Sequence, residues 1–207
     1  DALTYVLHRT APGADIVVNC SYGTHAGPHD GSSLLEQALA EALAIARRDR
    51  GMWLVVPIGN AYQSACHAQT TVVDDEVLLR AEIDVPADKT TDTFIEVWYP
   101  RQVTIQERDV TIDVADLALT LTPPDCQQLV PDPGSRISSW SAPASQPAPS
   151  VTVVQTGEAT DTRHRILIVI APTWQRPGAE AEGLAPYGHW GLCLTSRRSD
   201  RVPIPVD

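Results

Sequence analysis

The spacing of hydrophobic and polar positions changes once along the chain, near residue 72. Before that point, short apolar runs flank a longer segment in which apolar residues recur every three or four positions, the spacing of one helix face. After it, short apolar runs recur about every ten residues with turn-forming residues between them, a pattern typical of antiparallel sheets. The pattern predicts an α/β domain over residues 1–72 and a β-rich domain over residues 73–207.

The first domain is expected to contain a strand–helix–strand unit. A helix over residues 1–11 precedes a strand at 15–20, and a second strand is expected at 52–58. The second strand is apolar without alternation, which is typical of a parallel strand covered on both faces. The connecting helix is expected to begin near Asp30 and to end at Gly51, because glycine commonly follows a helix. These elements predict part of a parallel sheet with helices.

The second domain is expected to be an all-β antiparallel sandwich of jelly-roll type. Residues 122–149 are rich in Pro, Ser, Asp and Gln, which predicts a long loop within the sandwich or a linker that splits it. We favour the loop, since neither half alone has enough strands for two sheets. The expected strands are Val77–Val85, Thr93–Tyr99, Val103–Gln106, Val110–Val114, Leu117–Leu121, Ser150–Gln155, Arg165–Ile170, His189–Thr195 and Val202–Val206.

The charge and the hydropathy of the chain limit the kinds of partner that we expect it to have. The formal net charge is −11, from 26 acidic and 15 basic residues, which argues against a nucleic-acid partner because phosphate binding needs a cationic face. No apolar stretch approaches the roughly 20 residues of a membrane span. Cys20, Cys66, Cys126 and Cys193 lie far apart in the sequence, so no zinc or redox motif is indicated and the disulfide pairing stays open.

The Gly59-Asn60 pair, at the end of the second expected strand, could carry chemistry. Glycine permits a sharp turn, and Asn60 can then project its amide into the crevice at the carboxyl end of a parallel sheet. A side-chain N–H aimed at a developing oxyanion stabilises an acyl-transfer transition state by about 3–4 kcal/mol. Gly-Asn pairs are also common in ordinary turns, and the dipeptide alone favours that interpretation.

The context of this pair changes the interpretation. Asn19-Cys20-Ser21-Tyr22-Gly23, then the helical segment at residues 30–39, and then an apolar strand into Gly59-Asn60 resemble the subtilisin-like serine proteases (peptidase S8 family). The resemblance covers about residues 1–70. The β-rich domain, with Phe94–Tyr99 after Asp-Val-Pro-Ala-Asp, more loosely resembles a β insertion of certain bacterial members.

The resemblance implies specific roles. Asn60 would be the oxyanion-hole residue of a serine endopeptidase that acts through an acyl-enzyme. Ser21, Tyr22, Gly23 and Gly59 would line the cleft of a peptide or protein substrate, whose backbone pairs with the cleft wall as an added strand. The family also implies a secreted or cell-envelope protein.

The chain departs from the family pattern in its catalytic residues. It contains no Asp-Ser/Thr-Gly, no His-Gly-Thr and no Gly-Thr-Ser-x-Ala segment. We therefore expect an internal fragment of a longer protease that is inert by itself, since it has neither nucleophile nor base. A second hypothesis is a non-enzymatic peptide- or glycan-binding β-sandwich protein with a degenerate protease scaffold. A third is an α/β unit from another doubly wound family.

No metal and no cofactor are predicted. His25, His29 and Asp30 cluster in one loop, but their spacing fits no established ligand pattern. His67 is expected either to orient the Gly59-Asn60 turn or, as we favour, to lie in the core. The tryptophans fall mostly in expected strands, which favours core packing.

Overall fold

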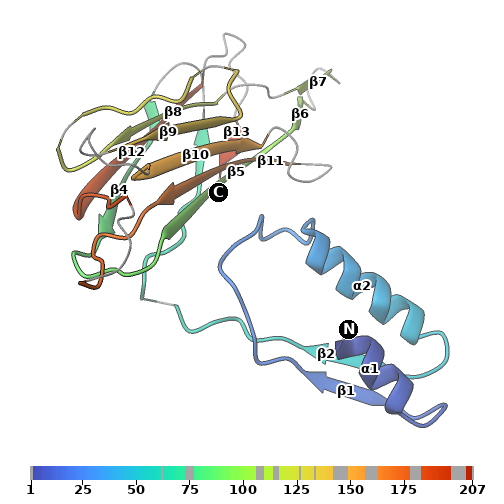
Figure 1. Ribbon diagram of the computed structural model, residues 1–207. Coiled ribbons are helices and arrows are strands. Elements are labelled where there is room, and N and C mark those ends of the chain that lie inside the picture. Colours follow the sequence, from blue (N-terminus) through green and yellow to red (C-terminus); the bar gives the residue numbers. More distant parts are fainter. Residues whose placement is uncertain are drawn as a thin grey trace. The chain divides into compact units, whose positions relative to one another are not determined.

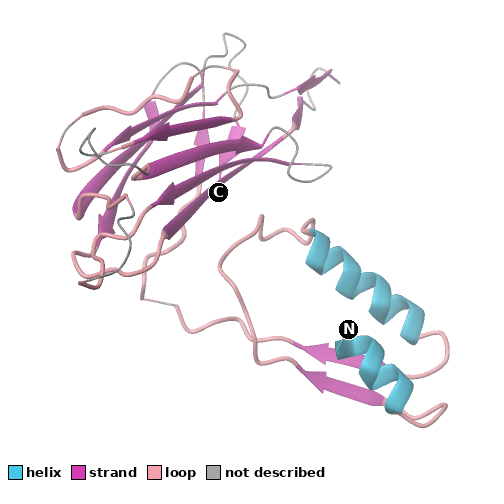
Figure 2. Cartoon of the chain, viewed as in Figure 1, coloured by secondary structure: helices cyan, strands magenta, loops and turns pink. Residues whose placement is uncertain are grey.

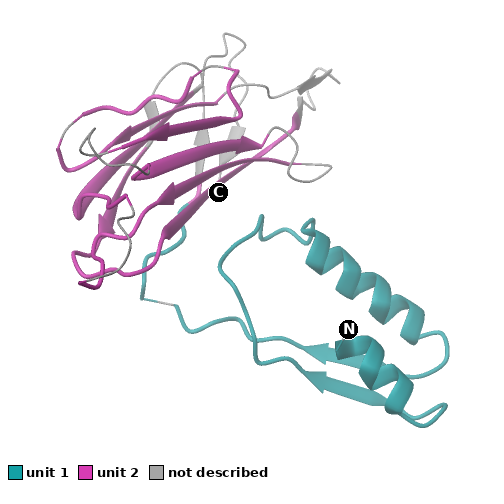
Figure 3. Ribbon diagram, in the orientation of Figure 1, with its two compact units in different colours: residues 1–68 teal, residues 69–207 magenta. Residues whose placement is uncertain are grey.

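The computed structural model describes residues 2–61, 63–72, 77–105, 110–113, 117–125, 127–132, 134–141, 149–156, 163–177, 183–196 and 204–206. The chain forms two compact units, Asp1–Ala68 (unit 1) and Gln69–Asp207 (unit 2) (Figure 3). Each unit is described by itself. The division into domains over residues 1–72 and 73–207 remains a prediction from the sequence.

Unit 1 contains two helices and two strands (Figure 1). They are α1 (Ala2–Arg9), β1 (Ile16–Asn19), α2 (Leu34–Ala46) and β2 (Met52–Val55). The strands pair in parallel, with Ile16 opposite Met52 and Asn19 opposite Val55. The Cys20 N–H donates to the Val55 carbonyl oxygen at 2.9 Å and extends the ladder by one bond. The parallel pairing expected for these two segments is thus confirmed.

The β1–β2 sheet is covered on one face only. Ile16, Met52 and Ala46 are buried, and half-buried side chains of α1 and α2 pack against them. Alternate strand residues point to the other face, where Val17, Trp53 and Val55 are 70%, 49% and 52% exposed. The prediction of a strand covered on both faces is therefore wrong.

Helix α2 is shorter than its sequence pattern indicated. Ser33 forms the N-cap, accepting from the Glu36 N–H while the Glu36 carboxylate accepts from the Ser33 N–H. This capping box sets the start at Leu34, later than the expected start near Asp30, whose carboxylate instead accepts from the Ser32 N–H at 2.9 Å. The helix ends at Ala46, so the prediction that it ends at Gly51 was wrong.

Unit 2 is built from antiparallel pairings (Figure 2). One sheet has the strand order β5-β11-β10-β9 and a second has β4-β12-β8, while β13 pairs with β3 and β6 with β7. The strands are β3 (Thr70–Val72), β4 (Val77–Val85), β5 (Thr93–Pro100), β6 (Gln102–Ile105), β7 (Val110–Asp113), β8 (Leu117–Thr122), β9 (Ile137–Trp140), β10 (Val151–Thr156), β11 (Arg163–Ile170), β12 (Gly188–Ser196) and β13 (Ile204–Val206).

One hydrophobic core holds the two larger sheets of unit 2 together. Strand β8 alternates buried and half-buried residues along its length, and β11 does so from Ile166 to Ile170, as expected of sheets with one inward face. The centre is fully shielded from solvent at Ile168 of β11 and at Trp190 and Leu194 of β12. This cluster contains side chains from both sheets, which is how a sandwich buries its apolar surface.

The predicted fold class is wrong as stated. In the described residues the sheets are mostly antiparallel, and β1–β2 is a two-stranded parallel pair with two short helices, not part of a large parallel sheet. The error has a physical source, because an apolar run specifies burial or pairing but not how many strands lie beside it. Within the loop expected at 122–149, β9 forms a further strand that pairs with β10.

Candidate functional site

The ends of β1 and β2 lie at the same edge of the small sheet, because parallel strands bring their carboxyl ends together. Beyond the strands the two chain segments stay close. A Cβ atom built on Gly23 would lie 3.7 Å from Pro57 Cγ, and one built on Gly59 would lie 3.7 Å from His25 Cε1. The structure thus brings the segment that contains Ser21, Tyr22 and Gly23 beside the segment that leads to Asn60.

Gly59 makes the turn that the sequence predicted for it. Its φ is +89°, which lies in the region that residues with a Cβ rarely adopt. A Cβ atom added at this position would be at ordinary contact distance from the neighbouring His25 ring, so space does not require glycine here. Only the positive φ angle of the backbone requires glycine at this position.

Asn60 presents its side chain to solvent immediately after this turn. Within the described residues its carboxamide, which has two N–H donors, makes no hydrogen bond. The chain then continues into a further turn, in which the Ser64 N–H and hydroxyl both donate to the Ala61 carbonyl oxygen, at 3.0 and 2.7 Å. The carboxamide is therefore exposed on a backbone that hydrogen bonds fix on its C-terminal side.

The opposite segment offers one hydroxyl and one aromatic ring. Ser21, Tyr22 and Gly23 are all exposed, and the Asn19 side-chain amide donates to Ser21 Oγ at 3.2 Å. Tyr22 leaves most of its ring in solvent. These three residues could contact an extended peptide by backbone pairing and by one aromatic surface.

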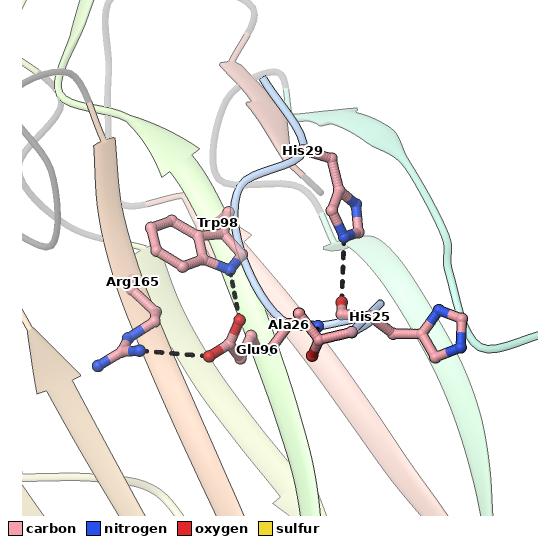
Figure 4. A network of polar contacts seen from close by, with 7 residues as sticks. His25, Ala26, His29, Glu96, Trp98 and Arg165 are labelled. Carbon is pink, nitrogen blue, oxygen red and sulfur yellow. Dashed lines mark hydrogen bonds and ion pairs between the residues drawn. The ribbon is translucent and has the colours of Figure 1, made fainter. Parts of the chain in front are cut away.

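Three histidines lie in the loops of unit 1. The His29 ring donates from Nε2 to the His25 carbonyl oxygen at 3.0 Å (Figure 4). The ring centroids of His29 and His67 are 5.3 Å apart. His67 is exposed, so the favoured interpretation of a core histidine was wrong. In the part of the chain that the structure describes, no group of three His, Cys, Asp or Glu side chains is placed to hold a metal ion.

Unit 2 carries a second polar cluster, on the face of β5 and β11 that points away from the core. The Trp98 indole N–H donates to Glu96 at 2.9 Å, and Arg165 donates to the other oxygen of the same carboxylate at 3.2 Å (Figure 4). The Arg165 guanidinium lies 5.6 Å from the Trp98 ring centroid. Trp98 is only 6% exposed although it is on the outer face of the sheet.

Other sequence-based expectations have mixed outcomes. Cys20, Cys66 and Cys193 are free thiols, and Cys126 lies outside the described residues. Trp190 is a core residue as expected, whereas Trp53 and Trp174 are exposed. Neither helix of the described chain is long and apolar enough to cross a membrane.

Comparison with known proteins found a similarity in structure but none in sequence family. No family model matches the chain, and no curated protein matches it. Among solved structures it is similar to the CspB protease of Clostridium perfringens, with a TM-score of 0.60 and 17% sequence identity over 92% of this chain. The match covers 34% of that protein's chain, so this chain spans about a third of its length.

This likeness relates the fold of the chain to a segment of a protease. It does not support the family assignment made from the sequence. The prediction that residues 1–70 make the chain a member of the subtilisin-like family, as an internal fragment with a β-rich insertion, is corrected, because no family model matches and an identity of 17% shows the fold alone. Asn-x-Ser-x-Gly and Gly-Asn are short segments that strand ends and turns favour for local reasons, and such motifs do not define a family.

Proposed function

We propose that unit 1 supplies the oxyanion-binding and substrate-binding side of a serine endopeptidase active site. In this proposal the Asn60 carboxamide donates a hydrogen bond to the tetrahedral oxyanion. Ser21, Tyr22, Gly23 and Gly59 line the cleft that holds a peptide or protein substrate. The observation that carries the proposal is the exposed Asn60 carboxamide directly after the Gly59 turn, in the segment that follows the carboxyl end of the parallel strand β2.

The chemistry assigned to Asn60 is electrostatic. When a serine oxygen attacks the scissile carbonyl carbon, its proton passes to a general base, a C–O bond forms and the carbonyl π electrons move onto the carbonyl oxygen. A fixed N–H donor binds this oxyanion more strongly than the neutral carbonyl, which lowers the barrier by about 3–4 kcal/mol. The chain contains no segment typical of the catalytic Asp, His or Ser of this mechanism. We therefore propose that the nucleophile and the base lie outside residues 1–207 and that this chain alone is inactive.

The exposed face of the small sheet supports a role within a larger fold. Val17, Trp53 and Val55 form a contiguous apolar surface, because Val17 and Trp53 are register partners and Val55 lies two residues along β2 on the same side. Contiguous apolar surface of this kind typically marks an interface. The fold likeness to a segment of a protease agrees with this role.

The test is Asn60→Ala in the full-length protein that contains these residues, assayed on a fluorogenic peptide that the unmodified protein cleaves. We expect kcat to fall about 10²- to 10³-fold with KM nearly unchanged, because the lost bond forms only in the transition state. Gln63→Ala is the matched control, since Gln63 is an exposed carboxamide three residues away, and it should keep full activity. A normal kcat in Asn60→Ala would remove Asn60 from the mechanism.

A further inference from the structure

A pocket of about 90 Å³ lies in unit 2, where the chain after β8 meets the end of β9, the start of β10 and the segment before β12. Its lining includes Pro123, Trp140, Pro186 and Trp190. The volume exceeds by several-fold what one water molecule requires. It is large enough for a side chain of a bound molecule.

Two polar groups in the wall of this pocket have partners inside the protein. The Trp190 indole N–H donates to the Pro186 carbonyl oxygen at 3.0 Å. The buried Ser150 hydroxyl donates to the Leu184 carbonyl oxygen at 2.8 Å. Trp190 and Pro123 are buried behind the wall, so the half-buried Trp140 and Pro186 supply the aromatic and apolar surface that a ligand can reach.

Asp125 is the one charged side chain among the described residues that line the pocket. It is exposed at the rim, and its Oδ1 accepts from the Gln127 N–H at 3.3 Å. Oδ2 makes no hydrogen bond within the described residues. The pocket thus combines one accessible aromatic side chain, Trp140, with one carboxylate oxygen that can accept a hydrogen bond from a ligand.

We propose that this pocket binds a cationic side chain, lysine or arginine, of a peptide partner. The alkyl stem of such a side chain packs on apolar walls while its charged end stays near water. A cation is attracted both to an aromatic face and to a carboxylate. An anion would be repelled by Asp125, and a fully apolar group would remove water from that carboxylate without replacing its hydrogen bonds. The proposal goes beyond the protease function and does not depend on it.

The test uses the intact 207-residue chain and two matched small probes. Nα-acetyl-lysine methylamide carries the cation, and Nα-acetyl-norleucine methylamide has a similar stem without it. Each is titrated while the indole N–H signals of Trp140 and Trp190 are followed by ¹H–¹⁵N NMR. We expect saturable shifts of these signals with the lysine probe at a Kd of about 1–10 mM, and at least about fivefold weaker binding of the norleucine probe. Equal binding of the two probes, or lysine binding that leaves both indole signals unmoved, would overturn the proposal.

Two variants test whether the Asp125 carboxylate contributes to binding of the lysine probe. Asp125→Asn keeps an oxygen that accepts from the Gln127 N–H and removes only the charge, so it should fold and raise the Kd of the lysine probe at least about threefold. Asp92→Asn, an exposed carboxylate of unit 2 that does not line the pocket, should leave that Kd unchanged. If both variants bind alike, Asp125 does not recognise the cation and the proposal fails. None of these outcomes depends on Asn60.

Discussion

Gly59 and Gly23 form a matched pair of positions at the candidate site. A Cβ atom added at either position would meet its nearest atom at the same distance, 3.7 Å, which is ordinary contact. They differ in their backbones, since Gly59 has a φ of +89° and Gly23 is not among the residues with positive φ. Replacing Gly59 by alanine therefore adds backbone strain, whereas replacing Gly23 by alanine does not.

The expected difference follows from two terms. Alanine restricts the unfolded chain, which stabilises the folded state by about 0.4–1 kcal/mol at a compatible position. This term is the same for both variants and cancels in the comparison. Alanine at a positive φ costs about 1–2 kcal/mol. Gly59→Ala should thus be less stable than Gly23→Ala by about 1–2 kcal/mol, or about 5- to 30-fold in the ratio of folded to unfolded molecules.

Hydrogen exchange at the Cys20 amide measures this difference locally. That N–H donates to the Val55 carbonyl oxygen at 2.9 Å, beside both glycine-containing segments. Its exchange rate, followed by NMR under conditions where exchange reports the equilibrium of opening, should be about 5- to 30-fold higher in Gly59→Ala than in Gly23→Ala. Equal rates in the two variants would show that the Gly59 backbone angle does not determine the stability of this edge.

Two further predictions concern packing. Gly51→Ala should destabilise unit 1 by about 1–2 kcal/mol, because the new Cβ would lie 2.5 Å from the Trp53 ring and 2.6 Å from the Asp15 carboxylate that accepts the Gly51 N–H. A red shift of Trp53 fluorescence and faster hydrogen exchange of the Ile16 amide would report this loss of stability. Unchanged exchange would refute the steric argument. Ile168→Ala should lower the free energy of unfolding of unit 2, measured in urea, by about 2–5 kcal/mol, because Ile168 is 0% exposed. Val169→Ala, on the outer face of the same strand, should lower it distinctly less. Equal losses would contradict the assigned faces of β11.

Sequence periodicity predicted most strands of unit 2 but not β3 or β9. For β9 the reason lies at one of its two inward positions, where Ser138 takes the place that an apolar residue would normally occupy; Trp140 packs against the core at the other. Ser138 is buried, and its hydroxyl accepts from the Asp132 N–H at 3.1 Å, so the core tolerates it. In a four-residue strand, a hydrogen-bonded serine at one of two inward positions hides the alternation, and flanking prolines strengthen the appearance of a loop.

The candidate site was predictable in part for a different reason. Parallel pairing of β1 and β2 follows from the strand–helix–strand pattern, and it brings the two strand ends together without further information. The contact of His25 with Gly59 and the proximity of His29 and His67 could not be predicted. They depend on loop conformation, including a φ of 53° at His29, which a histidine adopts only where the surrounding loop imposes it.

The two units differ in how completely they bury their apolar residues, and this difference bears on the proposed function. In unit 2 the two larger sheets enclose one core that is fully shielded from solvent at its centre. In unit 1 the buried cluster comprises only Ile16, Ala46 and Met52 among the described residues, while Trp53 and Val55 of the same strand pair remain about half exposed. Because apolar burial is the main term that offsets chain entropy, unit 1 has less to hold its loops in place. We therefore expect the Gly59-Asn60 turn, to which oxyanion binding is proposed, to be most rigid where another protein segment covers the exposed face of the small sheet.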